Sequence, residues 1–125
     1  LGELVDFISI DVAFISLDKV LPVATTLLKN TGSLVALIKP QFEAGKEKVG
    51  KGGIVRERAV HEEVLSRILQ VAYDCELYLH GLTFSPIKGT EGNIEFLGYF
   101  TKSEEGALSI TDELITAVVD EAHAL

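Results

Sequence analysis

Residues 34–40 read LVALIKP, which is five consecutive apolar residues followed by a lysine and a proline. A short, continuous apolar run that ends at a breaker is typical of a strand buried on both faces of a parallel sheet. Proline has no backbone N–H to offer to a neighbouring strand, so the strand must end before it. The run therefore predicts a central strand over residues 34–38, with Lys39 at its carboxyl end.

The residues before this strand predict a second strand and a helix. Residues 5–10, VDFISI, indicate a strand buried on both faces that ends before Asp11. Apolar residues at helical spacing follow Ser16, the expected N-cap, and Pro22 should either kink this helix or begin its second piece. Residues 30–32, NTG, are a stop signal. Strand, helix and strand in this order predict a right-handed parallel unit.

The second half of the chain predicts two further strands and two helices. Helical spacing of apolar residues covers 60–72, and strand patterns cover 77–84 and 93–101. The short loop between these two strands makes them antiparallel neighbours, either directly or across one intervening strand. A last helix, capped at Ser109, presents apolar residues between 114 and 122. The expected fold is α/β, with a mixed sheet of parallel strands and one antiparallel strand flanked by helices.

Composition restricts the class of protein. The chain has 125 residues, 47% of them hydrophobic, and 11 basic against 19 acidic residues give a net charge of 11 − 19 = −8. This predicts one domain with a real core, and no apolar run is long enough for a membrane span. A lone cysteine, Cys75, favours a reducing cytoplasm. The chain starts at Leu1 and contains no methionine, which indicates a piece of a longer protein.

Residues 39–58 form a connector with six basic and three acidic residues, a local charge of +3 in an acidic chain. Its segment 45–51, GKEKVGK, fits the first seven positions of a phosphate-binding P-loop, but Gly52 replaces the hydroxyl residue that would bind magnesium. A glycine-rich loop that contacts RNA phosphates through Lys51, with Phe42 available for base stacking, explains the segment better. A solvated surface loop remains the alternative.

Three charged residues are expected to meet at one edge of the sheet. Asp11 and Lys39 follow two parallel strands, and Glu95 lies near the start of the strand that returns from the same edge. Ligands of open α/β sheets bind at this edge. An amine between two carboxylates is suited to moving a proton to or from a substrate hydroxyl. Solvated strand-end charges are the alternative interpretation.

No metal site is predicted. His61, His80 and His123 are far apart in the sequence and lack the spacing of paired metal ligands, so they are expected on helix or strand surfaces.

Four ordered blocks of the chain resemble the haemolysin-like TlyA family of ribosomal RNA 2′-O-methyltransferases, which is related to the FtsJ-type enzymes. The resemblance spans about residues 7 to 100. The blocks are DVAFISL (11–17), LIKPQFEAG (37–45), GKGGIVR (50–56) and SPIKG with GNIEFL (85–89 and 92–97). Ala13 stands where the family usually has serine, which leaves the tetrad described next unchanged.

The resemblance implies a catalytic Lys-Asp-Lys-Glu tetrad whose last three members are Asp11, Lys39 and Glu95. It also implies S-adenosylmethionine as cofactor, with Asp11 near its sulfonium. The first lysine, the glycine-rich cofactor loop and an S4-like RNA-binding domain would lie upstream of this chain. Residues 1–125 would then be the C-terminal part of a Rossmann-like methyltransferase domain, inactive alone. Residues expected to contact substrate are Phe42, Lys51, Ser85, Lys88 and Asn93.

The implied partner is ribosomal RNA or a ribosomal subunit, in the cytoplasm and without stable membrane association. Two other classes of protein remain as alternatives. The haemolysin label suggests a membrane-active protein, although the last helix has an acidic polar face that anionic lipid would repel. A non-catalytic half-domain that serves only for interaction is the second alternative, because the methyl-donor site within this chain is incomplete.

Overall fold

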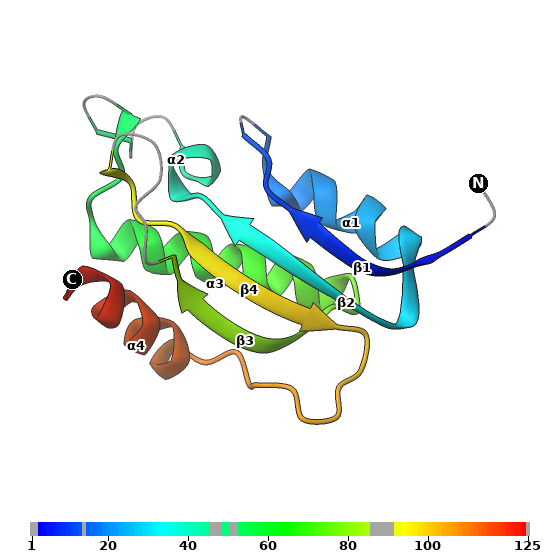
Figure 1. Ribbon diagram of the computed structural model, residues 1–125. Coiled ribbons are helices and arrows are strands. Elements are labelled where there is room, and N and C mark those ends of the chain that lie inside the picture. Colours follow the sequence, from blue (N-terminus) through cyan, green and yellow to red (C-terminus); the bar gives the residue numbers. More distant parts are fainter. Residues whose placement is uncertain (1–2, 14, 46–48, 51–52, 86–91, 125) are drawn as a thin grey trace.

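The fold is a four-stranded mixed sheet with its main helices gathered on one face (Figure 1). The computed structural model describes residues 3–13, 15–45, 49–50, 53–85 and 92–124. The strand order is β1-β2-β4-β3, with β1 parallel to β2 and with β4 antiparallel to both of its neighbours. The mixed α/β sheet expected from the sequence is confirmed.

The elements follow the predicted order, except that the expected connector at residues 39–58 begins with a short helix, α2, which was not predicted. In chain order they are β1 (Val5–Ile10), α1 (Leu17–Leu27), β2 (Leu28–Ile38), α2 (Pro40–Glu43), α3 (Arg58–Asp74), β3 (Tyr78–Phe84), β4 (Phe96–Thr101) and α4 (Asp112–His123). The antiparallel pairing of β3 with β4 is also as expected.

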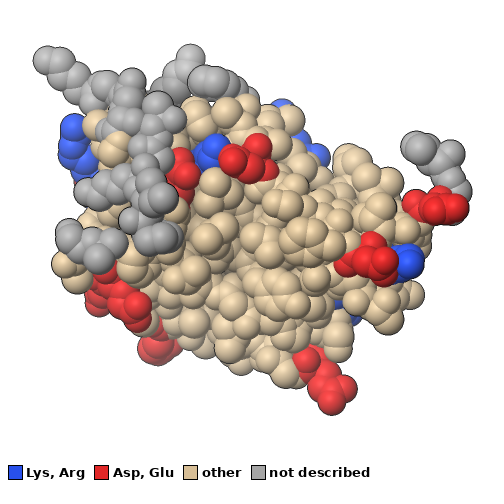
Figure 2. Space-filling view, in the orientation of Figure 1, with Lys and Arg blue, Asp and Glu red and all other residues tan. Residues whose placement is uncertain are grey.

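The core lies between the sheet and the helices. In the register of β2 and β4, Leu34 pairs with Phe100 and Ile38 pairs with Phe96, and all four side chains are fully buried. Helices α1, α3 and α4 pack side by side behind this face. The opposite face is less covered, and Figure 2 shows that it is mostly uncharged, with acidic residues at its lower rim. Among the described residues, no helix is long and apolar enough to cross a membrane.

Strand β1 is not buried on both faces, so that prediction is wrong. Ile10 is its one buried residue, whereas Phe7 is 55% exposed. The reason is its place in the sheet. Within the described part of the chain β1 pairs with β2 alone, so no described strand lies along its other side.

The stop signal at residues 30–32 is also wrong, because these residues lie inside β2. Strand β1 has a register shift between Val5 and Phe7 where it passes this segment. A Cβ at Gly32 would come within 2.8 Å of the Asp6 carbonyl oxygen and 2.6 Å of Leu28. Gly32 is therefore present to allow the close approach of two strands and does not end one.

Helix α1 confirms Ser16 as its N-cap, since Ser16 Oγ accepts a hydrogen bond from the Asp18 backbone N–H. Of the two alternatives for Pro22, the start of a second piece is wrong, because α1 continues through it. Proline removes the bond to the carbonyl four residues earlier, here that of Asp18. Both residues are exposed, so water can hydrate that carbonyl.

Two other boundaries differ from the prediction. Helix α4 is capped by Thr111, whose side chain accepts from the Leu114 N–H, and not by Ser109. Strand β4 begins at Phe96, three residues later than expected at Asn93. The side chain of Asn93 is used for a different purpose, described below.

Candidate active site

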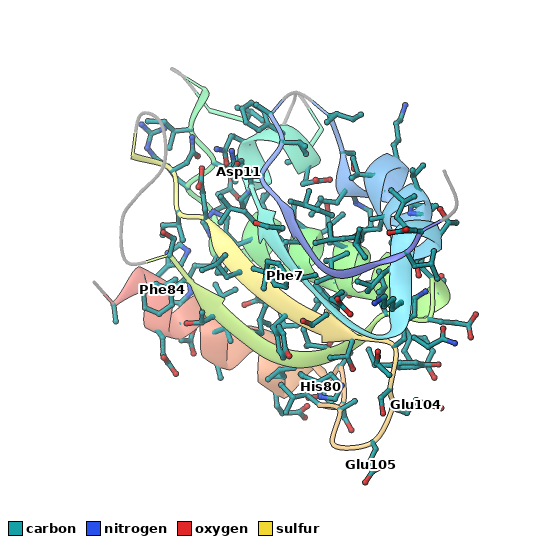
Figure 3. All side chains as sticks on the ribbon, turned by 45° about the vertical axis from the view of Figure 1, so that its right-hand side comes forward. Phe7, Asp11, His80, Phe84, Glu104 and Glu105 are labelled. Atoms are coloured by element: carbon teal, nitrogen blue, oxygen red, sulfur yellow. The ribbon has the colours of Figure 1, made fainter. Side chains whose placement is uncertain are left out.

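Asp11 and Lys39 form an ion pair at the carboxyl ends of the two parallel strands. Each directly follows its strand, β1 or β2, and Lys39 Nζ lies 2.5 Å from Asp11 Oδ1. The Lys39 side chain is 15% exposed, whereas that of Asp11 is 64% exposed. In Figure 3, Asp11 lies beside α2, at the end of the sheet opposite His80 and Glu104. This edge is where open α/β sheets bind ligands.

Glu95 lies at the same edge. The last pair between β2 and β4 is Ile38 with Phe96, so Lys39 and Glu95 extend from adjacent positions of neighbouring strands. Glu95 is 7% exposed, and its Oε2 accepts a hydrogen bond of 3.0 Å from Gln41 Nε2. Because a carboxylate accepts but does not donate, this contact fixes the orientation of the Gln41 amide.

Sequence reasoning missed Gln41. The sequence signal that could have pointed to Gln41 is its position directly after Lys39 and Pro40. With its amide nitrogen held by Glu95, the Oε1 of Gln41 is buried without a hydrogen-bond partner among the described residues. A buried acceptor of this kind, beside the charged residues, is suited to receive a donor from a ligand or a water.

Of the five residues expected to contact substrate, two lie near this group. The Phe42 ring centroid is 6.0 Å from Lys39 Nζ, in the range of a cation–π contact. The backbone N–H of Ser85 donates to the Glu95 carbonyl oxygen at 2.8 Å. Lys51 and Lys88 lie outside the described residues.

Asn93 is 2% exposed and holds the connector after α2. Its Oδ1 accepts from the Val55 N–H at 2.9 Å, and its Nδ2 donates to the Gly53 carbonyl oxygen at 3.0 Å. With both ends of the amide bonded to backbone and almost no exposed surface, Asn93 positions residues 53–55 and has little surface for a substrate. This use of the side chain also explains why β4 begins only after Asn93.

We expect Asn93→Ala to lower the free energy of unfolding by about 1–3 kcal/mol, because the buried Val55 N–H loses its acceptor. Urea denaturation followed by circular dichroism measures the loss. Asn93→Asp is the matched control, since it keeps the acceptor for Val55 but directs a second oxygen at the Gly53 carbonyl. A change smaller than about 0.5 kcal/mol in the alanine variant would contradict this positioning role.

His61 is not on a helix surface, so the prediction is wrong for this residue. His61 is fully buried in α3, and its Nδ1 lies 2.8 Å from Nε2 of His123 in α4. His61 Nε2 donates to the Val55 carbonyl oxygen at 3.1 Å. Burial, and second the nearby His123, lower the pKa of His61 to about 4. Among the described residues, no group of three His, Cys, Asp or Glu side chains could hold a metal ion.

The fold and this edge together are typical of an α/β enzyme domain, with an amine and two carboxylates gathered where the strands end. The chain belongs to the FtsJ-like methyltransferase family, whose sequence profile matches residues 1–102.

Three similar proteins support this assignment. YqxC of Bacillus subtilis, a candidate rRNA methyltransferase, is 48% identical over 94% of this chain and 43% of its own length. TlyA of Mycobacterium tuberculosis, named a 16S/23S rRNA (cytidine-2′-O)-methyltransferase, is 33% identical over 87% of this chain and 41% of its own length. Hemolysin A of Brachyspira hyodysenteriae is 43% identical over 78% of this chain and 41% of its own length.

A solved structure has the same fold. The candidate hemolysin of Streptococcus thermophilus superposes with a TM-score of 0.88 at 46% identity, over 98% of this chain and 44% of that one. The chain thus spans about two fifths of the length of the curated relatives that it matches.

Proposed function

We propose that the full-length protein carrying this chain methylates a ribose 2′-hydroxyl of ribosomal RNA with S-adenosylmethionine as methyl donor. The observation that carries this proposal is the Lys39 amine, paired with Asp11 at 2.5 Å and adjacent to Glu95 at the strand ends. The names of YqxC and TlyA agree with an rRNA substrate, and that of TlyA agrees with a ribose oxygen as the methylated atom.

Among the described residues, Asp11 fits the positively charged sulfonium of such a cofactor. Asp11 leaves nearly two thirds of its side chain exposed at the end of β1, so its carboxylate can face a positively charged group there. A sulfonium cofactor, when bound, supplies an electrophilic methyl group. We further propose that this chain is the C-terminal part of the methyltransferase domain, that an upstream half completes the cofactor site, and that the chain alone is inactive.

The chemistry assigned to Lys39 is acceptance of a proton. A ribose 2′-hydroxyl is a weak nucleophile, and a neutral amine within hydrogen-bond distance can take its proton as the oxygen attacks. Because Lys39 pairs with Asp11 as an ammonium, it must first release one proton to water before it can act in this way. Asp11 orients the amine through the ion pair, and the buried Glu95 carboxylate holds the hydroxyl or the amine in line. Gln41 Oε1, which has no hydrogen-bond partner among the described residues, is a further acceptor at the same edge.

The substrate surface is proposed to lie on the connector side of this edge. Phe42 is half-buried beside Lys39, and its ring can stack on an unpaired base. Among the basic residues of the connector, Arg58 already pairs with Asp120, so its charge is partly used within the protein. Lys51, Ser85 and Lys88 remain proposed contacts to RNA, and the protein is proposed to act on ribosomal RNA or subunits in the cytoplasm.

The decisive test is nucleoside analysis of ribosomal RNA from cells with and without the protein. We expect one or more 2′-O-methylated nucleosides to be lost and to return when the wild-type protein is supplied, but not when Lys39→Ala is supplied. Loss of a base-methylated nucleoside with all 2′-O-methyl groups unchanged would overturn the proposed chemistry, because the tetrad provides acid and base groups for a hydroxyl.

A further inference from the structure

Glu43, the last residue of α2, bridges two segments that carry the candidate catalytic residues. Its Oε1 accepts a hydrogen bond of 2.5 Å from Ser16 Oγ, and its Oε2 accepts one of 2.9 Å from the Leu17 N–H. Ser16 lies five residues after Asp11, and Glu43 lies four residues after Lys39. One carboxylate therefore ties the connection that follows β1 to the short helix that follows β2.

The Glu43 carboxylate is buried, with 3% of its side chain exposed, and it is compensated from two directions. Arg67 of α3 donates from NH2 to the Glu43 carbonyl oxygen at 2.7 Å and to Oε1 at 3.2 Å. The N-terminus of α1, where Ser16 and Leu17 lie, supplies the positive end of a helix dipole. The bridge is thus anchored to α3 as well as to the start of α1.

The ion pair between Asp11 and Lys39 is a weaker link. Asp11 is largely exposed, and exposed pairs contribute little because water competes for both charges. The contacts of Glu43 are charge-assisted, and its carboxylate is shielded from solvent, so they are stronger and more restrictive. The ladder of β1 and β2 aligns the two strands up to Ile10. Beyond it, the segment that follows Asp11 is held against α2 more by Glu43 than by the ion pair.

We propose that Glu43 is a positioning residue for methyl transfer, which holds the segments that follow Asp11 and Lys39 against each other through Ser16, Leu17 and Arg67. The inference rests on the proposed function, because it concerns the same two residues. Glu43 itself contacts no reacting atom in this scheme. A displacement of about 1 Å at a reacting group is enough to lower a rate about 100-fold.

The test is methyl transfer to ribosomal RNA by the full-length protein, with kcat and KM measured separately. We expect Glu43→Ala to lower kcat about 10- to 100-fold, with KM for RNA within about threefold of the wild type. Glu43→Gln keeps one acceptor oxygen in the same place, so it should recover much of the lost kcat. Ser16→Ala removes one of the contacts and should have a smaller effect than Glu43→Ala.

Asp120→Ala is the matched control. It breaks an ion pair between α4 and Arg58 of α3, away from the bridge, and should leave kcat unchanged. All assays are run at a temperature where denaturation curves show each variant fully folded. If Glu43→Ala does not fold, Ser16→Ala decides, and wild-type kcat in a folded Ser16→Ala protein would overturn the inference.

Two further results would distinguish failure of this inference from failure of the proposed function. A folded Glu43→Ala protein with wild-type kcat, or a loss of kcat no larger than that of Asp120→Ala, would remove Glu43 as a positioning residue while leaving the proposed function intact. A wild-type protein that transfers no methyl group would instead refute the proposed function. Hydrogen exchange then still tests the bridge, because the Leu17 amide should exchange faster in Glu43→Ala than in the wild type.

Discussion

Lys39→Ala in the full-length protein should abolish methyl transfer while changing the free energy of unfolding by no more than about 1 kcal/mol. The two expectations have separate physical reasons. The variant has no amine to accept the hydroxyl proton. The partner left behind, Asp11, is 64% exposed and stays hydrated without Lys39. Single-turnover transfer of labelled methyl groups to ribosomal RNA, combined with urea denaturation, measures both quantities.

Lys39→Arg separates a base from a simple positive charge. Arginine keeps the ion pair with Asp11 and the contact with the Phe42 ring, but it does not give up its proton at accessible pH. If Lys39 accepts the proton, the arginine variant should be about as inactive as the alanine variant. A folded and active Lys39→Arg protein would show that Lys39 acts through its charge, and the base would then have to be another group, such as the upstream lysine that the family resemblance implies.

The sequence was sufficient to place Lys39 at a sheet edge, because the signals for it are local. A five-residue apolar run followed by Lys-Pro defines where β2 ends, whatever the rest of the chain does. Helix α3 was predicted for the same reason, since its apolar residues recur at the helical period within one segment. Asp11 and Glu95 then followed from the topology of the sheet.

The contacts that hold this edge together could not be predicted in the same way. Glu43 reaches Ser16 across 27 residues and Gln41 reaches Glu95 across 54, and neither contact leaves a periodic pattern. The prediction for β1 failed for a related reason. Whether an apolar strand is central or at an edge depends on its neighbours, and the residues of the strand itself are the same in both cases.

The contact between His61 and His123 is another that no local sequence pattern predicts. It makes the stability of the folded protein depend on pH. The Val55 carbonyl can only accept, so Nε2 of His61 carries a proton and Nδ1 of the neutral ring accepts from His123. Protonation of Nδ1 would turn this acceptor into a donor, and His123 would have to give up its Nε2 proton to keep the contact. The His61 ring also packs edge-on against Phe96 in the core.

We expect the folded protein to lose about 3 kcal/mol of stability through His61 as the pH falls from about 6.5 to about 4. In the folded state the pKa of His61 is about 4, because burial and then His123 disfavour the charged ring. The unfolded chain binds this proton near the ordinary value of 6.5. Below that pH the unfolded state binds a proton at His61 that the folded state does not bind, so acid favours unfolding. Below about pH 4 His61 is protonated in both states, and the stability falls no further through this residue.

Urea denaturation of the wild type and of His61→Phe at several pH values between 7.5 and 4 isolates this contribution from that of the carboxylates. The phenylalanine variant should be less stable near pH 7.5, because the Val55 carbonyl loses its donor, but the difference should shrink or reverse in acid. His123→Gln is the matched control: its amide can still donate to Nδ1 of His61 but carries no titratable charge, so part of the acid sensitivity should disappear. A difference between wild type and His61→Phe that stays constant across this range would show that His61 does not remain neutral in the folded protein for the reasons given.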